Sequence, residues 1–151
     1  MIVRTGITSF YSRNKLPEFP FNEFKRMAYA CATPCGYNVT GLLKRGVTPN
    51  FHTAALESPN ERVHLLGHST FPIFAFTEPR GEHTCELTFR EVATIANLLN
   101  QMFPDVTIAT LEELSKPIAR TDLEQLDRAE IAQVKYWKPH TIGELAFNWW
   151  D

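Results

Sequence analysis

The chain has 151 residues, of which 44% are hydrophobic and 21% are charged, a composition typical of globular rather than disordered proteins. This length fits a single domain spanning residues 1–151, because domains cluster around roughly 100–150 residues. The formal net charge of −2 argues against direct nucleic-acid binding, which needs a basic surface to displace counterions.

Three cysteines are an odd number and too few for a disulfide scaffold, which fits a reducing compartment. The first residues lack the basic and apolar regions of a secretory signal peptide. No apolar run approaches the roughly 18–20 residues that span a bilayer. We therefore expect a cytoplasmic protein without a membrane partner.

The N-terminal part of the chain contains one expected extended segment and one expected helix. Residues 2–10 are rich in β-branched and aromatic side chains, which favours a strand or an extended arm. Apolar residues at helical spacing predict a helix over 23–32, with Asn22 as its N-cap. Pro34 and Gly36 should end this helix.

Four short apolar runs then recur at intervals of about ten residues, separated by turn-forming groups. The runs are 38–45, 51–57, 62–68 and 71–77. This spacing predicts an antiparallel meander with one face on the core. Pro72 has no amide to donate, so it should lie on an edge strand or at the start of a strand.

A second helix is predicted after the meander. Thr88 and Glu91 have the spacing of a capping box, in which each side chain accepts from a free amide of the first turn. The residues that follow form one apolar stripe at helical spacing: Val92, Ile95, Ala96, Leu99, Met102 and Phe103. Pro104 should end the helix, and residues 106–110 read as a further strand.

From residue 110 onward the sequence predicts short helical pieces with possible caps, and the tail after Tyr136 is expected to close the chain as a short helix or a strand. The caps and their partners three residues on are Thr110 with Glu113, Thr121 with Glu124, Asp127 with Glu130, and Thr141 with Glu144. The expected fold class is therefore α+β, with an antiparallel meander of about four to six strands packed against a few helices.

Metal binding is weakly supported. Cys31, Cys35, His83 and Cys85 are ligand types that zinc prefers. Their spacing does not form the usual zinc loops, because Cys31 lies in the predicted helix and Cys35 beyond its end. We expect Cys31 to act as a small core residue, and we expect no metal or other cofactor.

Histidines on the predicted meander are candidate catalytic groups. His64 and His68 are four residues apart on one strand, about 13 Å, which is too far to share a metal ion. If neighbouring strands align suitably, His52 lies beside His64 and could do acid/base work with the carboxylate of Glu57. The alternative is that these histidines are ordinary strand residues.

An acidic segment is the candidate binding surface. Six carboxylates occur between residues 112 and 130: Glu112, Glu113, Asp122, Glu124, Asp127 and Glu130. Three basic residues accompany them: Lys116, Arg120 and Arg128. Such a segment is either the solvated face of helices or a surface that attracts a basic protein partner.

The C-terminal tail carries three tryptophans, Trp137, Trp149 and Trp150. They fit either of two roles, plugs that close the core or anchors at a protein interface, where tryptophan is enriched.

The run from Lys135 to Asp151, KYWKPHTIGELAFNWWD, resembles the tail of small bacterial proteins from toxin–immunity gene pairs. These include the immunity proteins of contact-dependent inhibition and other polymorphic toxin systems. Such proteins share no common fold, so the resemblance carries over no binding residue. It implies a cytoplasmic, non-enzymatic protein that binds one toxin domain and blocks it.

Two functional hypotheses follow. The first is a specific protein-binding module, most simply an immunity protein whose acidic segment binds a basic toxin domain such as a nuclease. The alternative is a small hydrolase or isomerase that uses His52 and His64 with Glu57, which requires these side chains to meet in one pocket.

Overall fold

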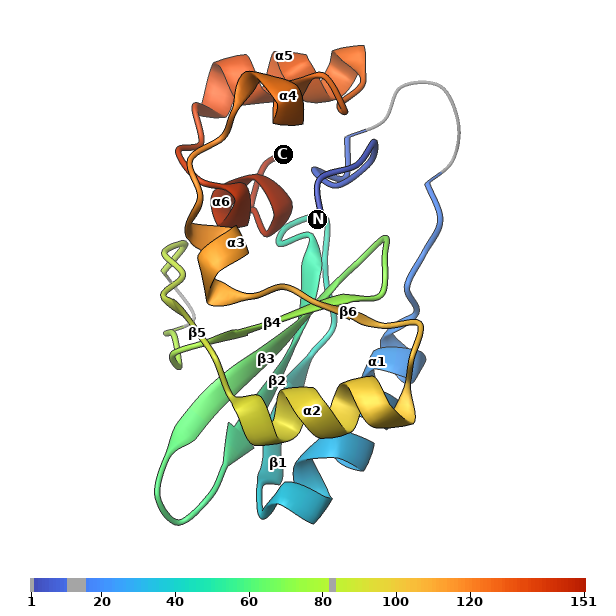
Figure 1. Ribbon diagram of the computed structural model, residues 1–151, viewed down its shortest axis with the longest axis vertical. Coiled ribbons are helices and arrows are strands. Elements are labelled where there is room, and N and C mark those ends of the chain that lie inside the picture. The colour runs from blue at the N-terminus through green and yellow to red at the C-terminus, as the bar shows by residue number, and fades with distance from the viewer. Residues whose placement is uncertain (1, 11–15, 82–83) are drawn as a thin grey trace.

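The structure is a computed structural model that describes residues 2–10, 16–81 and 84–151. Figure 1 shows a central sheet with α1 and α2 at one end of the molecule and α4 and α5 at the other. Both chain termini lie near α6, between the sheet and the α4–α5 end (Figure 1). The fold is α+β, as the sequence predicts.

Six strands form one mixed sheet that is mostly antiparallel. They are β1 (Asn38–Leu43), β2 (Phe51–Glu57), β3 (Arg62–His68), β4 (Ile73–Thr77), β5 (Phe89–Arg90) and β6 (Thr107–Ile108). Neighbours from β1 to β5 pair antiparallel in sequence order, which confirms the predicted meander. The last strand, β6, instead pairs parallel to β4.

Six α-helices and one short 3₁₀ turn complete the described residues. They are α1 (Phe21–Ala32), the 3₁₀ turn η1 (Thr33–Cys35), α2 (Ala93–Met102), α3 (Leu111–Ser115), α4 (Arg120–Leu123), α5 (Arg128–Trp137) and α6 (Ile142–Ala146).

Both faces of the sheet are covered, each by its own apolar cluster, because successive side chains on a strand point to opposite faces. On β2, Ala54 and Leu56 face α1 and α2, where Phe24 and Leu99 pack in the first cluster. Phe51 on the same strand faces the other way, into the second cluster.

The second cluster is built from the two ends of the chain together with α3 and α6. Ile2, Ile7 and Phe147 are buried there against sheet residues such as Leu66 and Ala75. The β-branched apolar residues of the N-terminal arm, Ile2, Val3 and Ile7, are thus core residues. The segment forms turns over residues 5–9 instead of the strand that is one of the two expected forms.

Two of the predicted helix starts are wrong. The first helix begins at Phe21 with Pro20 at its N-cap, and no side chain caps it, so Asn22 lies inside the helix. Thr88 and Glu91 form no capping box, since α2 begins only at Ala93. The carbonyl of Thr88 accepts from the Glu78 amide beside β4, which holds this segment to the sheet.

The later caps are partly as predicted. The side chains of Thr110, Asp127 and Thr141 each accept from the amide three residues on. Thr121 is not a cap, because α4 begins one residue earlier. There the carboxylate of Asp122 accepts from the Ala119 amide at 2.8 Å.

Helix α1 packs closely on the sheet over a glycine, and this contact provides a test of the packing. A Cβ built on Gly67 of β3 would lie 2.3 Å from the ring of Phe24. We therefore expect Gly67→Ala to lower the free energy of unfolding by about 1–3 kcal/mol, measured by urea denaturation. Gly41→Ala is the matched control in β1, since its Cβ would meet Ala55 at an ordinary 3.6 Å. Equal stability of the two variants would contradict this packing.

Candidate binding groove

A large groove lies where the C-terminal tail meets the segment that leads into β5. Its volume is about 1160 Å³. One wall is formed by residues 84–87 and 89, and the other by residues 137–141 and 147–151. Parts of α3 and α6, including Leu114 and Gly143, contribute to its lining.

A glycine in α6 allows this groove to form with closely packed walls. A Cβ on Gly143 would lie 2.5 Å from the ring of Phe89 and 3.1 Å from the carbonyl oxygen of Leu114. Because Gly143 has no Cβ, α6 contacts β5 and α3 directly. The tail that follows α6 is then held beside the 84–89 segment.

Aromatic side chains line the groove, and they are braced from behind. Trp149 packs edge-on against Phe51 of the sheet, with ring centroids 5.2 Å apart. Trp150 is buried and lies parallel to Trp137, with centroids 6.4 Å apart. Trp150 is therefore a core residue, one of the two roles that the sequence leaves open, whereas Trp137 is 38% exposed.

The rim carries both apolar and charged side chains. Leu111 is 38% exposed at the groove, which places a second large apolar side chain beside solvent. Three exposed acidic residues, Glu86, Glu144 and Asp151, and one exposed cation, Lys138, line the groove. The rim is therefore acidic on balance.

His52, a proposed catalytic residue, lies in the apolar layer under α1. It is 1% exposed and its ring packs among Phe19, Phe21 and Phe24. Its Nδ1 accepts from the Arg45 amide at 3.1 Å, so Nε2 carries the proton and donates to the Phe19 carbonyl at 2.9 Å. Burial lowers the pKa of His52. Both nitrogens are thus used to join loops to the sheet.

His64 lies on the other face of the sheet, so the expectation that it sits beside His52 is wrong. The register pairs His52 with Gly67, and His64 with Ala55. Positions 52 and 55 are an odd number of residues apart, which places the two imidazoles on opposite faces. Glu57 is exposed at the end of β2, opposite Arg62. The structure therefore does not assemble the three side chains that the enzyme hypothesis needs.

A third histidine, His68, is completely buried where the ends of the chain meet. Its Nε2 donates to the Ile7 carbonyl at 2.7 Å, and its Nδ1 accepts from the Thr70 amide at 3.0 Å. Burial lowers the pKa of His68 to about 4, with smaller contributions from nearby groups. The neutral ring is therefore a structural link between the N-terminal arm and β3.

This link makes stability depend on pH. Because the pKa of His68 is about 4 when folded and about 6.5 when unfolded, the unfolded chain binds more protons between these values. Stability from this group should be complete above pH 6.5 and should fall by roughly 3 kcal/mol as the pH drops to 4. Urea denaturation across this range measures the loss, and NMR titration of the His68 ring assigns it. A ring that titrates near pH 6.5 in the folded protein would exclude this role.

The six predicted binding carboxylates are not equivalent in the structure. Glu112 and Glu124 are exposed, and Glu124 lies 3.8 Å from Arg120. The other four bind backbone amides. Glu113 accepts from Ile2, Asp122 from Ala119, Asp127 from Glu130, and Glu130 from several donors.

Glu130 is fully buried and holds the N-terminal arm. Its Oε1 accepts from the amides of Gly6 at 2.8 Å and Asp127 at 3.2 Å. Its Oε2 accepts from both the amide and the hydroxyl of Thr8. A carboxylate with this many donors is satisfied inside the protein, so Glu130 is not part of a binding surface.

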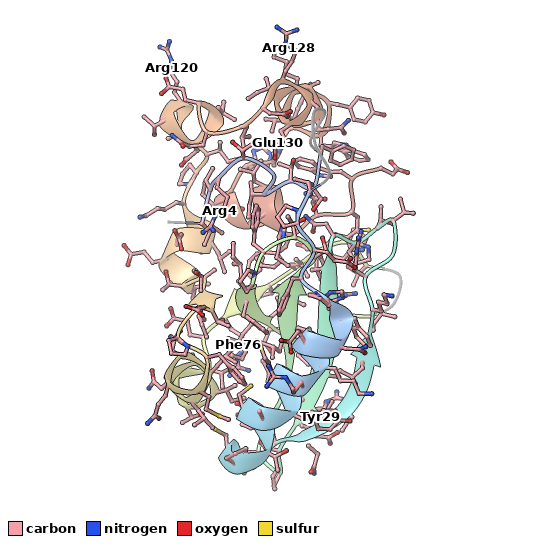
Figure 2. The ribbon with its side chains drawn as sticks, turned by 90° about the vertical axis from the view of Figure 1, so that its right-hand side faces the viewer. Arg4, Tyr29, Phe76, Arg120, Arg128 and Glu130 are labelled. Carbon is pink, nitrogen blue, oxygen red and sulfur yellow. The ribbon has the colours of Figure 1, made fainter. Side chains whose placement is uncertain are left out.

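The exposed charge of this segment is consequently basic rather than acidic. Figure 2 shows Arg120 and Arg128 extending away from the molecule at the α4–α5 end, with Glu130 on the inner side of α5. Lys116 is exposed as well. Four of the six carboxylates of this segment thus accept hydrogen bonds within the fold, while its three basic residues are exposed.

The buried carboxylate provides a second stability test. Glu130→Gln places an NH₂ group against backbone donors, so we expect a loss of about 2–4 kcal/mol in the free energy of unfolding. Glu124→Gln, at an exposed position in the same segment, should change stability by less than about 0.5 kcal/mol. Chemical denaturation of both variants measures the difference, and similar values would mean that the Glu130 contacts do not stabilise the arm.

The cysteines do not form a cluster. Cys31 is buried, as predicted, and burial raises the pKa of its thiol to about 12. Cys35 is half-buried and Cys85 is exposed, while His83 lies outside the described residues. Within residues 2–10, 16–81 and 84–151, no group of three or more His, Cys, Asp or Glu side chains is placed to hold a metal ion. No helix in these ranges is long and apolar enough to cross a membrane.

No protein-family model matches the chain, and no curated protein or solved structure shows significant similarity to it. The sequence indicates the tail as a possible interface, but it does not predict that residues 84–87 form the opposite wall of a groove. That wall has neither periodicity nor a motif, and it is brought to the tail only by packing around Phe89 and Gly143.

Proposed function

We propose that this chain is a specific protein-binding module whose groove receives a segment of a partner protein. In its most specific form, the proposal is a cytoplasmic immunity protein that binds and neutralises one toxin domain. The observation that carries it is the groove of about 1160 Å³ with tryptophans in its wall and large apolar side chains exposed at its rim.

The size and composition of the groove favour a polypeptide over a small ligand. Small-molecule pockets usually measure roughly 300–1,000 Å³ and enclose most of the ligand. Here Trp137 and Leu111 remain more than one third exposed at the rim. Tryptophans in braced positions are the side chains that most often dominate the energy of protein interfaces.

The charge at the rim favours a basic partner segment. A lysine or arginine side chain entering the groove would meet the carboxylates of Glu86 and Glu144 and the faces of the tryptophans, both of which attract cations. Many toxin domains that act on nucleic acids need basic surfaces. In this proposal the acidic rim of the groove attracts the basic partner, a role that the sequence predicts for the 112–130 segment. The exposed residues Glu112 and Glu124 of that segment still contribute to the attraction.

The proposal is tested with the C-terminal domain of the protein encoded immediately upstream of this gene. We expect a 1:1 complex that protects cells expressing that domain. Trp137→Ala should weaken binding at least tenfold, measured by calorimetry, because loss of an interface tryptophan typically costs 2 kcal/mol or more. Tyr29→Ala is the matched control, since Tyr29 is an aromatic residue 45% exposed on α1 and does not line the groove.

Two results would overturn the proposal. One is the absence of binding and protection by the wild-type chain. The other is equal binding by Trp137→Ala and wild type, which would exclude the groove. Circular dichroism of both variants checks that the fold is retained.

A further inference from the structure

Arg80 is a half-buried cation on the sheet face that carries the second apolar cluster. Its Nη2 donates to the hydroxyl of Thr53 at 3.0 Å. Its guanidinium lies over the rings of Phe51 and Trp149, at 5.4 and 5.3 Å from their centroids. Burial lowers the pKa of Arg80, so the surroundings oppose its charge.

Arg80 has no carboxylate partner among the residues that the structure describes, whereas Arg90 of β5, which is also half-buried, has two. Arg90 lies 2.9 Å from Glu61 and 3.7 Å from Glu78. For Arg80 the only hydrogen bond recorded within the described ranges goes to Thr53. A buried cation without a counter-charge is costly, since its desolvation is not offset by attraction.

Three buried polar atoms on this side of the sheet have no hydrogen-bond partners in the described part of the chain. They are Nδ1 of His64, Oγ1 of Thr77 and Nε of Arg80. Thr77 is 0% exposed. A buried polar group without a partner is costly, so in native proteins such an atom marks a bound water, an ion or a functional site.

The three groups share one region of the sheet. His64 of β3 and Thr77 of β4 are directly opposite each other in the register, so their side chains are neighbours on the same face. Thr53, which accepts from Arg80, pairs with Leu66, two residues from His64 on β3, so the guanidinium lies over the same face of the sheet as the imidazole. Burial and the charge of Arg80 also lower the pKa of His64. The face therefore presents three side chains that can donate, and one of them is a cation.

We propose that Arg80, His64 and Thr77 bind a small oxyanion group, either a carboxylate or a phosphate. Nε of Arg80, the Thr77 hydroxyl and a protonated Nδ1 of His64 each donate to one anionic oxygen. The anion supplies the acceptors and the counter-charge that the described residues around Arg80 do not supply. Trp149 contacts the guanidinium and also lines the groove, so the site adjoins the groove. Its occupation by a free anion does not depend on a protein partner.

The experiment is an NMR titration of the full chain with sodium phosphate and, separately, with sodium acetate, at pH 7 and constant ionic strength set by sodium chloride. We expect saturable shifts of resonances from β3 and β4. The anion that binds more tightly identifies the ligand group as tetrahedral phosphate or planar carboxylate. Shifts that grow linearly without saturation, or that chloride reproduces, would overturn the proposal.

Two variants assign the binding to these side chains. Thr77→Val removes only a hydroxyl that has no partner, so the fold should be at least as stable as wild type, while anion affinity should fall about tenfold. Arg80→Gln should lower affinity by tenfold or more. Arg26→Gln is the matched control, because Arg26 also lies over an aromatic ring, that of Phe103, on the other side of the sheet.

Unchanged affinity in Thr77→Val or in Arg80→Gln would overturn the assignment. So would a crystal structure grown in phosphate or acetate that shows only water bonded to the three atoms.

Discussion

The part of the molecule where the two ends of the chain meet depends on the buried carboxylate of Glu130. It satisfies amides of the N-terminal arm and the first turn of α5 at once, which joins segments more than 120 residues apart. The arm can then place Ile2 and Ile7 in the second apolar cluster. Because an internal carboxylate is tolerated only when its oxygens are fully used, the arm and helix must form together.

From Thr8 the polar contacts continue to the C-terminal tail. The Thr8 carbonyl accepts from the Asn148 side chain, whose backbone amide donates to Asn50. The Asn50 side chain in turn donates to the Ala146 carbonyl at 2.9 Å. The tail that carries the groove tryptophans is therefore held by a buried network. A binding surface on such a rigid base loses less conformational entropy when a partner docks, which favours the proposed role.

The distribution of charge shows why a count along the chain is a poor guide to a binding surface. The 112–130 segment has six carboxylates and three basic residues, yet the fold turns most of the carboxylates toward backbone amides. Arg120 and Arg128 instead extend into solvent (Figure 2), and Lys116 is exposed. The acidic character of the molecule instead reappears at the groove rim, from Glu86, Glu144 and Asp151.

The sequence by itself determined the features that depend on neighbouring residues. The spacing of apolar residues predicted the four antiparallel strands and the first two helices. The caps at Asp127 and Thr141 were predictable because their side chains accept from an amide only three residues away. Only the tertiary structure decided what depends on distant partners. Strand register placed His52 and His64 on opposite faces, and pairing to β4 drew Thr88 out of the predicted capping box. The physical reason is that a helix cap is satisfied within one turn of the chain, whereas the face of a strand residue and the direction of a carboxylate are set by groups far away in sequence.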